Sequence, residues 1–226
     1  MASRRQPTLP TDKAELILEH AQASVKSFSD AFDNVRAHRG AGRGMPTDED
    51  QDLLRAMLVF AGAGLDSLVK QLIRDALPAL LARDAGVQKR FEEFVFRRLR
   101  GDEDDPDLVT GNKFLARLLA SAQPRAQLIE EYVRELTGAS LQSAEELMRA
   151  AAALGLDSKS AGIDPKELKP IFAVRNKIIH ELDIDLEGQR RKRVVRAREQ
   201  MSKSADTLLN VGSTLIVKVL EKLAAA

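Results

Sequence analysis

The sequence contains no cysteine, and this absence excludes two classes of protein. A fold held by disulfide bonds and a zinc site built from thiolates both require cysteine side chains. Aromatic residues are also scarce, since they make up 4% of the chain, with one tyrosine and no tryptophan. A broad platform for stacking nucleic acid bases is therefore not expected, because such platforms are built from aromatic rings.

Long uninterrupted apolar runs are lacking as well. A membrane-spanning helix needs about 18 consecutive apolar residues, and no run in the sequence approaches that length. The N-terminal segment "MASRRQPTLP" is basic and lacks the apolar centre of a secretory signal peptide. We therefore expect a soluble, cytoplasmic protein without a membrane partner.

The charges are nearly balanced, with 35 Lys and Arg against 34 Asp and Glu, for a formal net charge of +1. The balance itself favours no partner, so the information lies in how the charges are segregated along the chain. Proline and glycine are few, and residues that favour helices, such as Ala, Leu, Glu, Lys and Arg, are common. The 226 residues suffice for one sizeable hydrophobic core.

Apolar residues recur at intervals of three or four along nearly the whole chain, which predicts helices and no series of strands. Long helices are expected over residues 13–39, from the cap Thr47 to residue 81, and from about residue 189 to the C-terminus. Asp164 and Pro165 are typical of a helix start and predict a further helix that ends near His180. The small residues "AGAG" at 61–64 indicate the close approach of another helix.

These elements predict an all-α protein, an antiparallel helical bundle with an embedded section of shorter helices. We expect a single domain over 1–226, in which 86–160 is a helical insertion and 1–10 is a flexible N-terminus. Three phenylalanines at helical spacing in the middle section favour core positions over a base-stacking surface: Phe91, Phe94 and Phe96.

The segment "VRNKIIHELD" at 174–183 carries the most specific information. On a helical wheel Arg175 falls within an apolar stripe formed by Leu168, Ile171, Phe172, Ile178, Ile179 and Leu182. A buried arginine is costly unless it meets a carboxylate, an opening to solvent or a ligand phosphate. Asn176 and His180 lie four residues apart, where the amide is within reach of the imidazole.

A purely structural interpretation of this segment is open. Arg175 then pairs with Glu181 or Asp183, and His180 ends the helix, where the helix dipole favours a cation. Asp66, on the inner half of the second long helix, has two candidate partners, Lys70 on its own helix and Arg175 across the bundle.

The pattern Arg175-Asn176-x-x-x-His180 resembles the R-x4-6-H motif of the HEPN superfamily, which are α-helical bundles with this motif late in the chain. The resemblance is greatest to single-domain prokaryotic HEPN ribonucleases of conflict and defence systems. It implies a metal-independent endoribonuclease that needs no cofactor. In such enzymes the 2′-hydroxyl of single-stranded RNA attacks the adjacent phosphodiester and leaves a 2′,3′-cyclic phosphate. Some members only bind RNA or nucleotides and regulate a partner.

The resemblance also implies roles for the three residues and for other chains. His180 would be the general acid or base, Arg175 would hold the scissile phosphate, and Asn176 would orient the imidazole or the 2′-hydroxyl. Two motifs, one from each chain of a homodimer, would form the site. By the same analogy the protein would be a toxin or defence effector with an antitoxin or regulatory partner protein.

Charges of opposite sign follow the motif in two blocks. In "ELDIDLEG" acidic and apolar residues alternate, which indicates a short extended connector or a tight turn rather than a continued helix. Its acids are expected to neutralise nearby cations rather than bind a metal. The next block is basic without an acid, and it predicts contacts to RNA phosphates from Arg190, Arg191, Lys192, Arg193 and Arg196. The alternative is a solvated helix start whose cations pair with the preceding acids.

Overall fold

The protein is described by a computed structural model over residues 9–40, 44–100, 108–188 and 191–225. Within these ranges the chain is all-helical, as predicted, and contains no strand. The helices are α1 (Asp12–His38), α2 (Asp48–Leu81), α3 (Ala85–Arg100), α4 (Leu108–Leu119), α5 (Pro124–Thr137), α6 (Ala144–Ala153), α7 (Pro165–Glu181) and α8 (Arg198–Ala225). Residues 1–8 of the expected flexible N-terminus lie outside the described residues.

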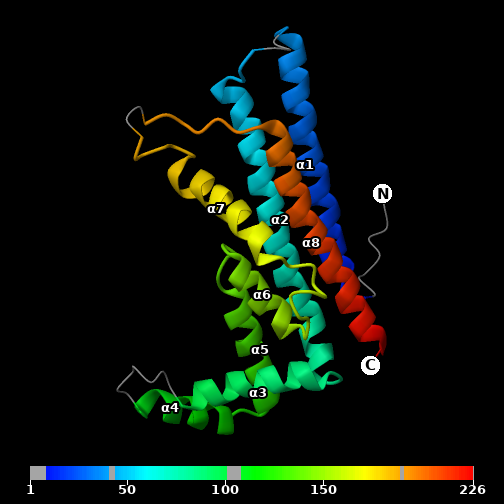
Figure 1. Ribbon diagram of the computed structural model, residues 1–226. Helices are drawn as coiled ribbons and strands as arrows, with labels where there is room; N and C mark the ends of the chain where they lie inside the picture. The colour runs from blue at the N-terminus through cyan, green and yellow to red at the C-terminus, as the bar shows by residue number, and fades with distance from the viewer. Residues whose placement is uncertain (1–8, 41–43, 101–107, 189–190, 226) are drawn as a thin grey trace, which may run out of the picture.

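The long helices α1, α2 and α8 lie side by side along the molecule, and α2 is the central one (Figure 1). It begins at the predicted cap Thr47, whose side chain accepts a hydrogen bond from the backbone N–H of Asp50 while the Asp50 carboxylate accepts one from the Thr47 N–H. This reciprocal capping satisfies two backbone donors at the helix start. By length and composition alone α2 is apolar enough to cross a membrane, but half of its most apolar stretch is buried against the other helices.

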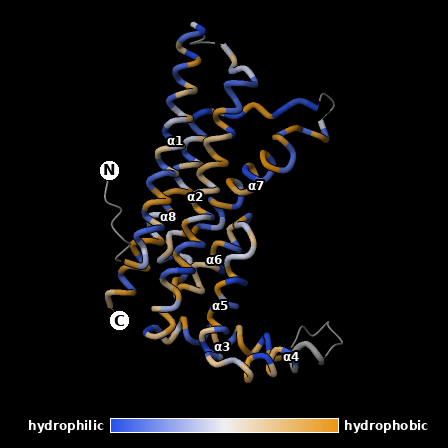
Figure 2. Tube along the Cα trace, turned by 180° about the vertical axis from the view of Figure 1, so that it is seen from behind, coloured by the Kyte–Doolittle hydropathy of each residue, from blue (hydrophilic) through white to orange (hydrophobic). Residues whose placement is uncertain are grey.

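The hydrophobic core follows the length of α2. Fully buried leucines recur at helical spacing along it: Leu54, Leu58, Leu65, Leu68 and Leu72. Figure 2 shows that hydrophobic residues repeat along the long helices. The leucines pack against the apolar stripes of α1, α7 and α8, so α2 holds the bundle together. Each such leucine contributes about 2 kcal/mol by its removal from water.

The small residues of α2 allow the close approach that their sequence predicts. An ideal Cβ placed on Gly64 would lie 2.4 Å from the Cβ of Ala21, a buried residue of α1. No side chain fits at that distance, so only glycine lets α1 and α2 pack at this spacing. The prediction from "AGAG" is confirmed.

The middle helices extend the molecule at one end. Helices α5 and α6 lie below α7, and α3 and α4 run across the end of the bundle (Figure 1). The rings of Phe91, Phe94 and Tyr132 form a buried cluster with centroids 4.8–6.2 Å apart. The prediction of core positions is therefore confirmed for Phe91 and Phe94 but wrong for Phe96, which is 66% exposed. The status of this section as an insertion stays a prediction.

The chain between α7 and α8 differs from the expected helix start at residue 189. Helix α8 begins only at Arg198, and the chain before it is extended, with an antiparallel bridge between Ile184 and Arg193. The side-chain amide of Gln51 binds this segment twice, donating to the Arg196 carbonyl at 3.1 Å and accepting from the Arg196 N–H at 2.7 Å. These tertiary hydrogen bonds replace those of a helix. Of the two forms predicted for "ELDIDLEG", a tight turn is present at Leu182 and Asp183, and the bridged Ile184 follows it.

The substitution Gly64→Ala tests the close packing of α1 and α2. Alanine favours a helix more than glycine does, but its methyl group would force the two helices apart. We expect a loss of about 1–3 kcal/mol in the free energy of unfolding, measured by urea denaturation. Ser67→Ala, at an exposed position of the same helix, is the control and should change the value by less than about 0.5 kcal/mol. A more stable Gly64→Ala protein would contradict this account of the packing.

Candidate functional site

Helix α7 carries the predicted motif, and its two ends are well defined. The Asp164 side chain accepts a hydrogen bond from the Lys166 N–H at 2.8 Å, and Pro165 follows as the first helical residue, as the sequence predicts. At the other end Leu182 and Asp183 adopt left-handed backbone conformations with φ of 52° and 60°. Such conformations are unfavourable for residues other than glycine. Here they turn the chain back sharply toward α2.

Arg175 lies on the buried side of α7, as predicted, and is 8% exposed. Its Nη1 donates to the Oδ1 of Asn176 at 3.0 Å, whereas its Nε is buried without a hydrogen-bond partner in the part of the chain that the structure describes. The apolar stripe around it is confirmed for Leu168, Ile171, Phe172 and Ile178, which are buried. The prediction of a buried stripe is wrong for Ile179 and Leu182, which are 39% and 63% exposed, because the end of α7 projects beyond the bundle.

The electrostatic partner of Arg175 is Asp66 of α2. Burial lowers the pKa of Arg175, and the negative charge of Asp66 opposes that shift by favouring the cation. Asp66 also forms an ion pair with Lys70 at 2.8 Å, so both of its predicted partners have a role. Among the described residues, neither Glu181 nor Asp183 pairs with Arg175, and this part of the structural interpretation is wrong.

Asn176 and His180 open onto a common hollow at the C-terminal end of α7. The hollow has a volume of about 550 Å³ and is lined by Ala173, Asn176, Lys177, His180, Glu181, Asp185, Leu186 and Glu187. His180 is exposed, and the Asn176 amide does not bond to its imidazole, because Nδ2 donates to the Gln142 carbonyl at 2.9 Å. Arg175 is not among the lining residues. A single chain thus brings Asn176 and His180 to one opening and holds Arg175 behind Asn176.

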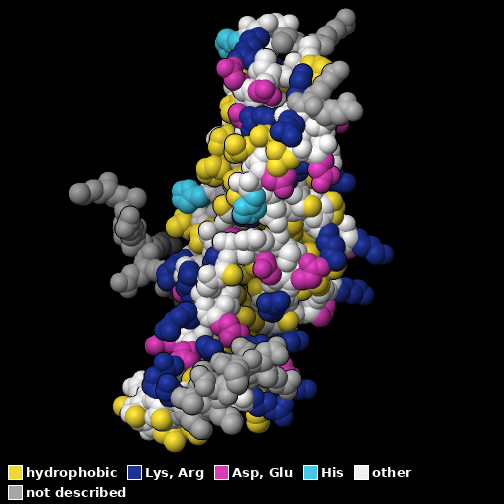
Figure 3. Space-filling view, turned by 90° about the vertical axis from the view of Figure 1, so that its left-hand side faces the viewer, with side chains coloured by type: hydrophobic (Ala, Val, Ile, Leu, Met, Phe, Trp, Pro, Cys, Tyr) yellow, Lys and Arg dark blue, Asp and Glu magenta, His cyan; other side chains and the backbone are white. Residues whose placement is uncertain are grey.

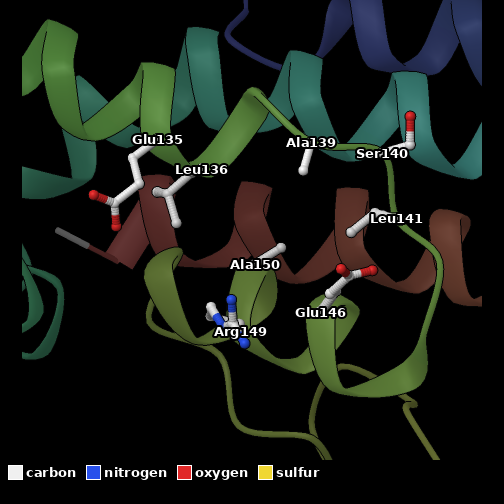
Figure 4. Close-up of a pocket in the computed structure, with 8 residues that line it drawn as sticks. All are labelled: Glu135, Leu136, Ala139, Ser140, Leu141, Glu146, Arg149 and Ala150. Carbon is white, nitrogen blue, oxygen red and sulfur yellow. The ribbon is translucent and has the colours of Figure 1, made fainter. Parts of the chain in front are cut away.

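The motif is tied to the loop between α5 and α6. Besides the bond from Asn176 to Gln142, the Leu141 N–H donates to the Oδ1 of Asp66 at 2.8 Å. The same loop borders a smaller hollow of about 90 Å³ between α5 and α6, which Figure 4 shows. Its side chains of opposite charge, Glu135, Glu146 and Arg149, indicate no recognisable catalytic or metal-binding arrangement.

The basic segment after the motif is partly neutralised. Arg193 pairs with Asp52 of α2 at 2.6 Å, an interaction that raises the pKa of Arg193. Arg196 binds the carboxylate of Asp183 through two nitrogens, at 3.0 and 2.5 Å. Arg191 and Lys192 are exposed and free of ion pairs among the described residues. Arg190 lies outside the described residues.

Two of the cations predicted to contact RNA are therefore bound to acids within the chain. The expected pairing with preceding acids holds for Arg196 and Asp183, whereas Arg193 pairs with an acid of α2. On the face shown in Figure 3, basic and acidic side chains of the described residues are interspersed and do not form one broad basic surface. Arg191 and Lys192 remain the described candidates for phosphate contacts.

A buried charge cluster around Asp183 was missed at the level of sequence. The Asp183 side chain is fully buried and also accepts a hydrogen bond from the Nε of Arg55 at 3.2 Å. Arg55, itself buried on α2, donates from Nη2 to the Val194 carbonyl at 2.9 Å. The available signal was the position of Arg55 among the core leucines of α2. This cluster fixes the segment after α7 onto α2, and Asp185, Leu186 and Glu187 of that segment line the His180 hollow.

Comparison of the chain with protein-family models, with curated proteins and with solved structures found no match. The resemblance of the motif to the HEPN superfamily therefore rests on the residues of α7 and on their place in an all-helical chain. Among the described residues no group of three or more His, Asp and Glu side chains is arranged to hold a metal ion.

Replacing Asp183 by alanine tests the buried cluster. The substitution leaves Arg196 without its carboxylate and leaves the buried Arg55 with only the half-exposed Asp52 as an ion-pair partner. We expect the free energy of unfolding to fall by about 3–5 kcal/mol, as measured by urea denaturation. Glu187→Ala removes an exposed acid from the same connector and should have little effect. Equal stability of the two variants would show that Asp183 does not anchor the segment.

Proposed function

We propose that the protein is a metal-independent endoribonuclease of HEPN type that cleaves single-stranded RNA. In this proposal a ribose 2′-hydroxyl attacks the adjacent phosphorus, the 5′-oxygen leaves with a proton, and a 2′,3′-cyclic phosphate forms. His180 takes or gives the proton, because imidazole titrates near neutral pH. Arg175 stabilises the charge on the phosphoryl oxygens, and Asn176 orients the reacting groups.

One observation supports the proposal most directly: Arg175 is buried, and one of its hydrogen-bond donors is unsatisfied. Among the described residues its Nε has no hydrogen-bond partner, and no carboxylate forms an ion pair with its guanidinium. A guanidinium that served packing alone would need such a partner, because an unsatisfied buried charge is costly. An incoming phosphate would accept hydrogen bonds from this guanidinium and add its negative charge to that of Asp66. Asn176 links the guanidinium to the hollow where His180 lies.

A second chain is part of the proposal. Large apolar side chains are exposed beside His180, with Ile179 at 39%, Leu182 at 63% and Leu186 at 57%. Apolar groups gathered at a surface are typical of a protein interface. A homodimer formed over the end of α7 would bury them and bring two motifs together.

Incubation of the protein with single-stranded RNA in EDTA tests the catalytic assignment. We expect wild-type protein to produce 2′,3′-cyclic phosphate ends, detected by mass spectrometry. His180→Ala should reduce the rate by about 100-fold or more, and Arg175→Ala by a similar factor because the phosphate charge loses its partner. His20→Ala, which removes an exposed histidine of α1, is the matched control. Equal cleavage by all four proteins would refute the assignment.

The dimer has its own test. Leu186→Glu places a charge on the apolar rim beside His180 without touching the core. We expect it to convert a dimer to a monomer in analytical ultracentrifugation while the melting temperature of the protomer is retained. Val217→Glu, on an exposed apolar position of α8, should leave the dimer intact. A wild-type protein that sediments as a monomer at all concentrations would refute the dimer.

A second function, binding of RNA or nucleotide without cleavage, is favoured by one specific feature. Arg175, which would have to reach the scissile phosphate in a nuclease, does not line the hollow. Under this alternative RNA binds through Arg191 and Lys192 with an affinity that falls steeply with salt. The same incubation separates the two functions, since a regulatory binding module retains RNA but produces no cyclic phosphate ends.

A further inference from the structure

Arg175 lies directly against the backbone of α2 at Gly62. An ideal Cβ placed on Gly62 would be 3.3 Å from the Nε of Arg175, 3.5 Å from its Cγ and 3.8 Å from its Cδ. Gly62 is buried in the interior of α2, where alanine would favour the helix more. The glycine therefore leaves space that the arginine side chain occupies.

The opposite side of the guanidinium is also constrained. Nη1 of Arg175 donates to Oδ1 of Asn176, and Nδ2 of Asn176 donates to the Gln142 carbonyl. The loop that carries Gln142 is in turn bound to α2, through the bond from the Leu141 N–H to Asp66. Arg175 thus lies between the backbone of α2 and an amide that is anchored on the same helix.

This closed set of contacts leaves Arg175 little room to move. If a methyl group at Gly62 displaced the guanidinium by a few tenths of an ångström, Asn176 would have to follow or lose its hydrogen bond. Asn176 lines the hollow that contains His180. A change at Gly62, which does not line the hollow, would therefore alter the arrangement of polar groups inside it.

We infer that Gly62 is a positioning residue, which sets the depth of the Arg175 guanidinium and through it the place of Asn176 in the hollow. The inference rests on the proposed function where it concerns RNA cleavage. Its geometric part, the coupling between Gly62 and Arg175, can be measured without RNA.

A double-mutant cycle tests the geometric part, with Gly62→Ala, Arg175→Ala and the combined variant. In the Arg175→Ala background the space is free, so Gly62→Ala should raise the melting temperature by about 3 °C through its better helix propensity. In the wild-type background the clash should cancel or reverse this gain. Equal shifts in both backgrounds would overturn the inference.

Gly212→Ala is the matched control for the cycle. Its Cβ would lie 3.2 Å from Cδ1 of Leu68, a similarly close contact on α8 that has no link to Arg175. Its effect on the melting temperature should be the same with and without Arg175. Coupling of equal size at Gly212 would mean that the cycle reports general loosening of the core, and the inference would fail.

Cleavage kinetics and NMR test the consequence for the site. We expect Gly62→Ala to lower kcat about tenfold with little change in KM, because a displaced guanidinium stabilises the transition state less well. Gly212→Ala should leave kcat unchanged. In heteronuclear NMR spectra, Gly62→Ala should shift the side-chain amide signal of Asn176, whereas Gly212→Ala should not.

The outcomes separate the two proposals. Coupling in the cycle, together with wild-type protein that cleaves no RNA, would refute the proposed function and support the positioning role. Cleavage by wild type with an unchanged kcat and an unshifted Asn176 signal in Gly62→Ala would refute the positioning role and leave the proposed function standing.

Discussion

The buried carboxylate of Asp183 is the interaction on which the site region depends. The carboxylate binds Arg55 of α2 and Arg196 of the segment before α8. The backbone N–H of Asp183 donates to the Lys177 carbonyl at 3.1 Å. A carboxylate with no exposure is stable only when its charge is compensated and its oxygens are hydrogen-bonded. Both conditions are met here, so the end of α7, the connector and the start of α8 are held on α2 together.

The same helix supports the motif from the other side. Gly62 leaves room for Arg175, and Asp66 partly offsets the effect of burial on its charge while holding the loop before α6. Helix α2 contributes no described residue to the lining of the His180 hollow. Through these contacts it nevertheless determines where the groups of α7 lie. The surplus hydrogen-bonding capacity of the buried Arg175 is the feature that most strongly supports a site for an anion, because packing alone does not explain it.

Short-range sequence patterns were sufficient to predict most of the helices. The cap at Thr47, the start of α7 at Asp164 and Pro165, the burial of Arg175 and the close approach at "AGAG" all follow from short-range patterns of residue type. The predicted start of α8, at about residue 189, was nine residues too early, because α8 begins at Arg198. The segment 191–197 has no strong helix-breaking residue. It is not helical because Gln51 and Arg55 of α2 bind its backbone and Asp183 binds its Arg196 side chain.

By itself the sequence determined the helical class, the apolar faces and the motif of Arg175, Asn176 and His180, because these depend on spacing within a single helix. Only the tertiary structure decided the partners of each charge. Asp52 and Asp183 neutralise Arg193 and Arg196, whereas Arg175 is buried without an ion pair to any described residue and His180 is exposed. The reason is physical: whether a cation is free or paired depends on groups that the fold brings within a few ångströms, and spacing along the chain contains no such distance.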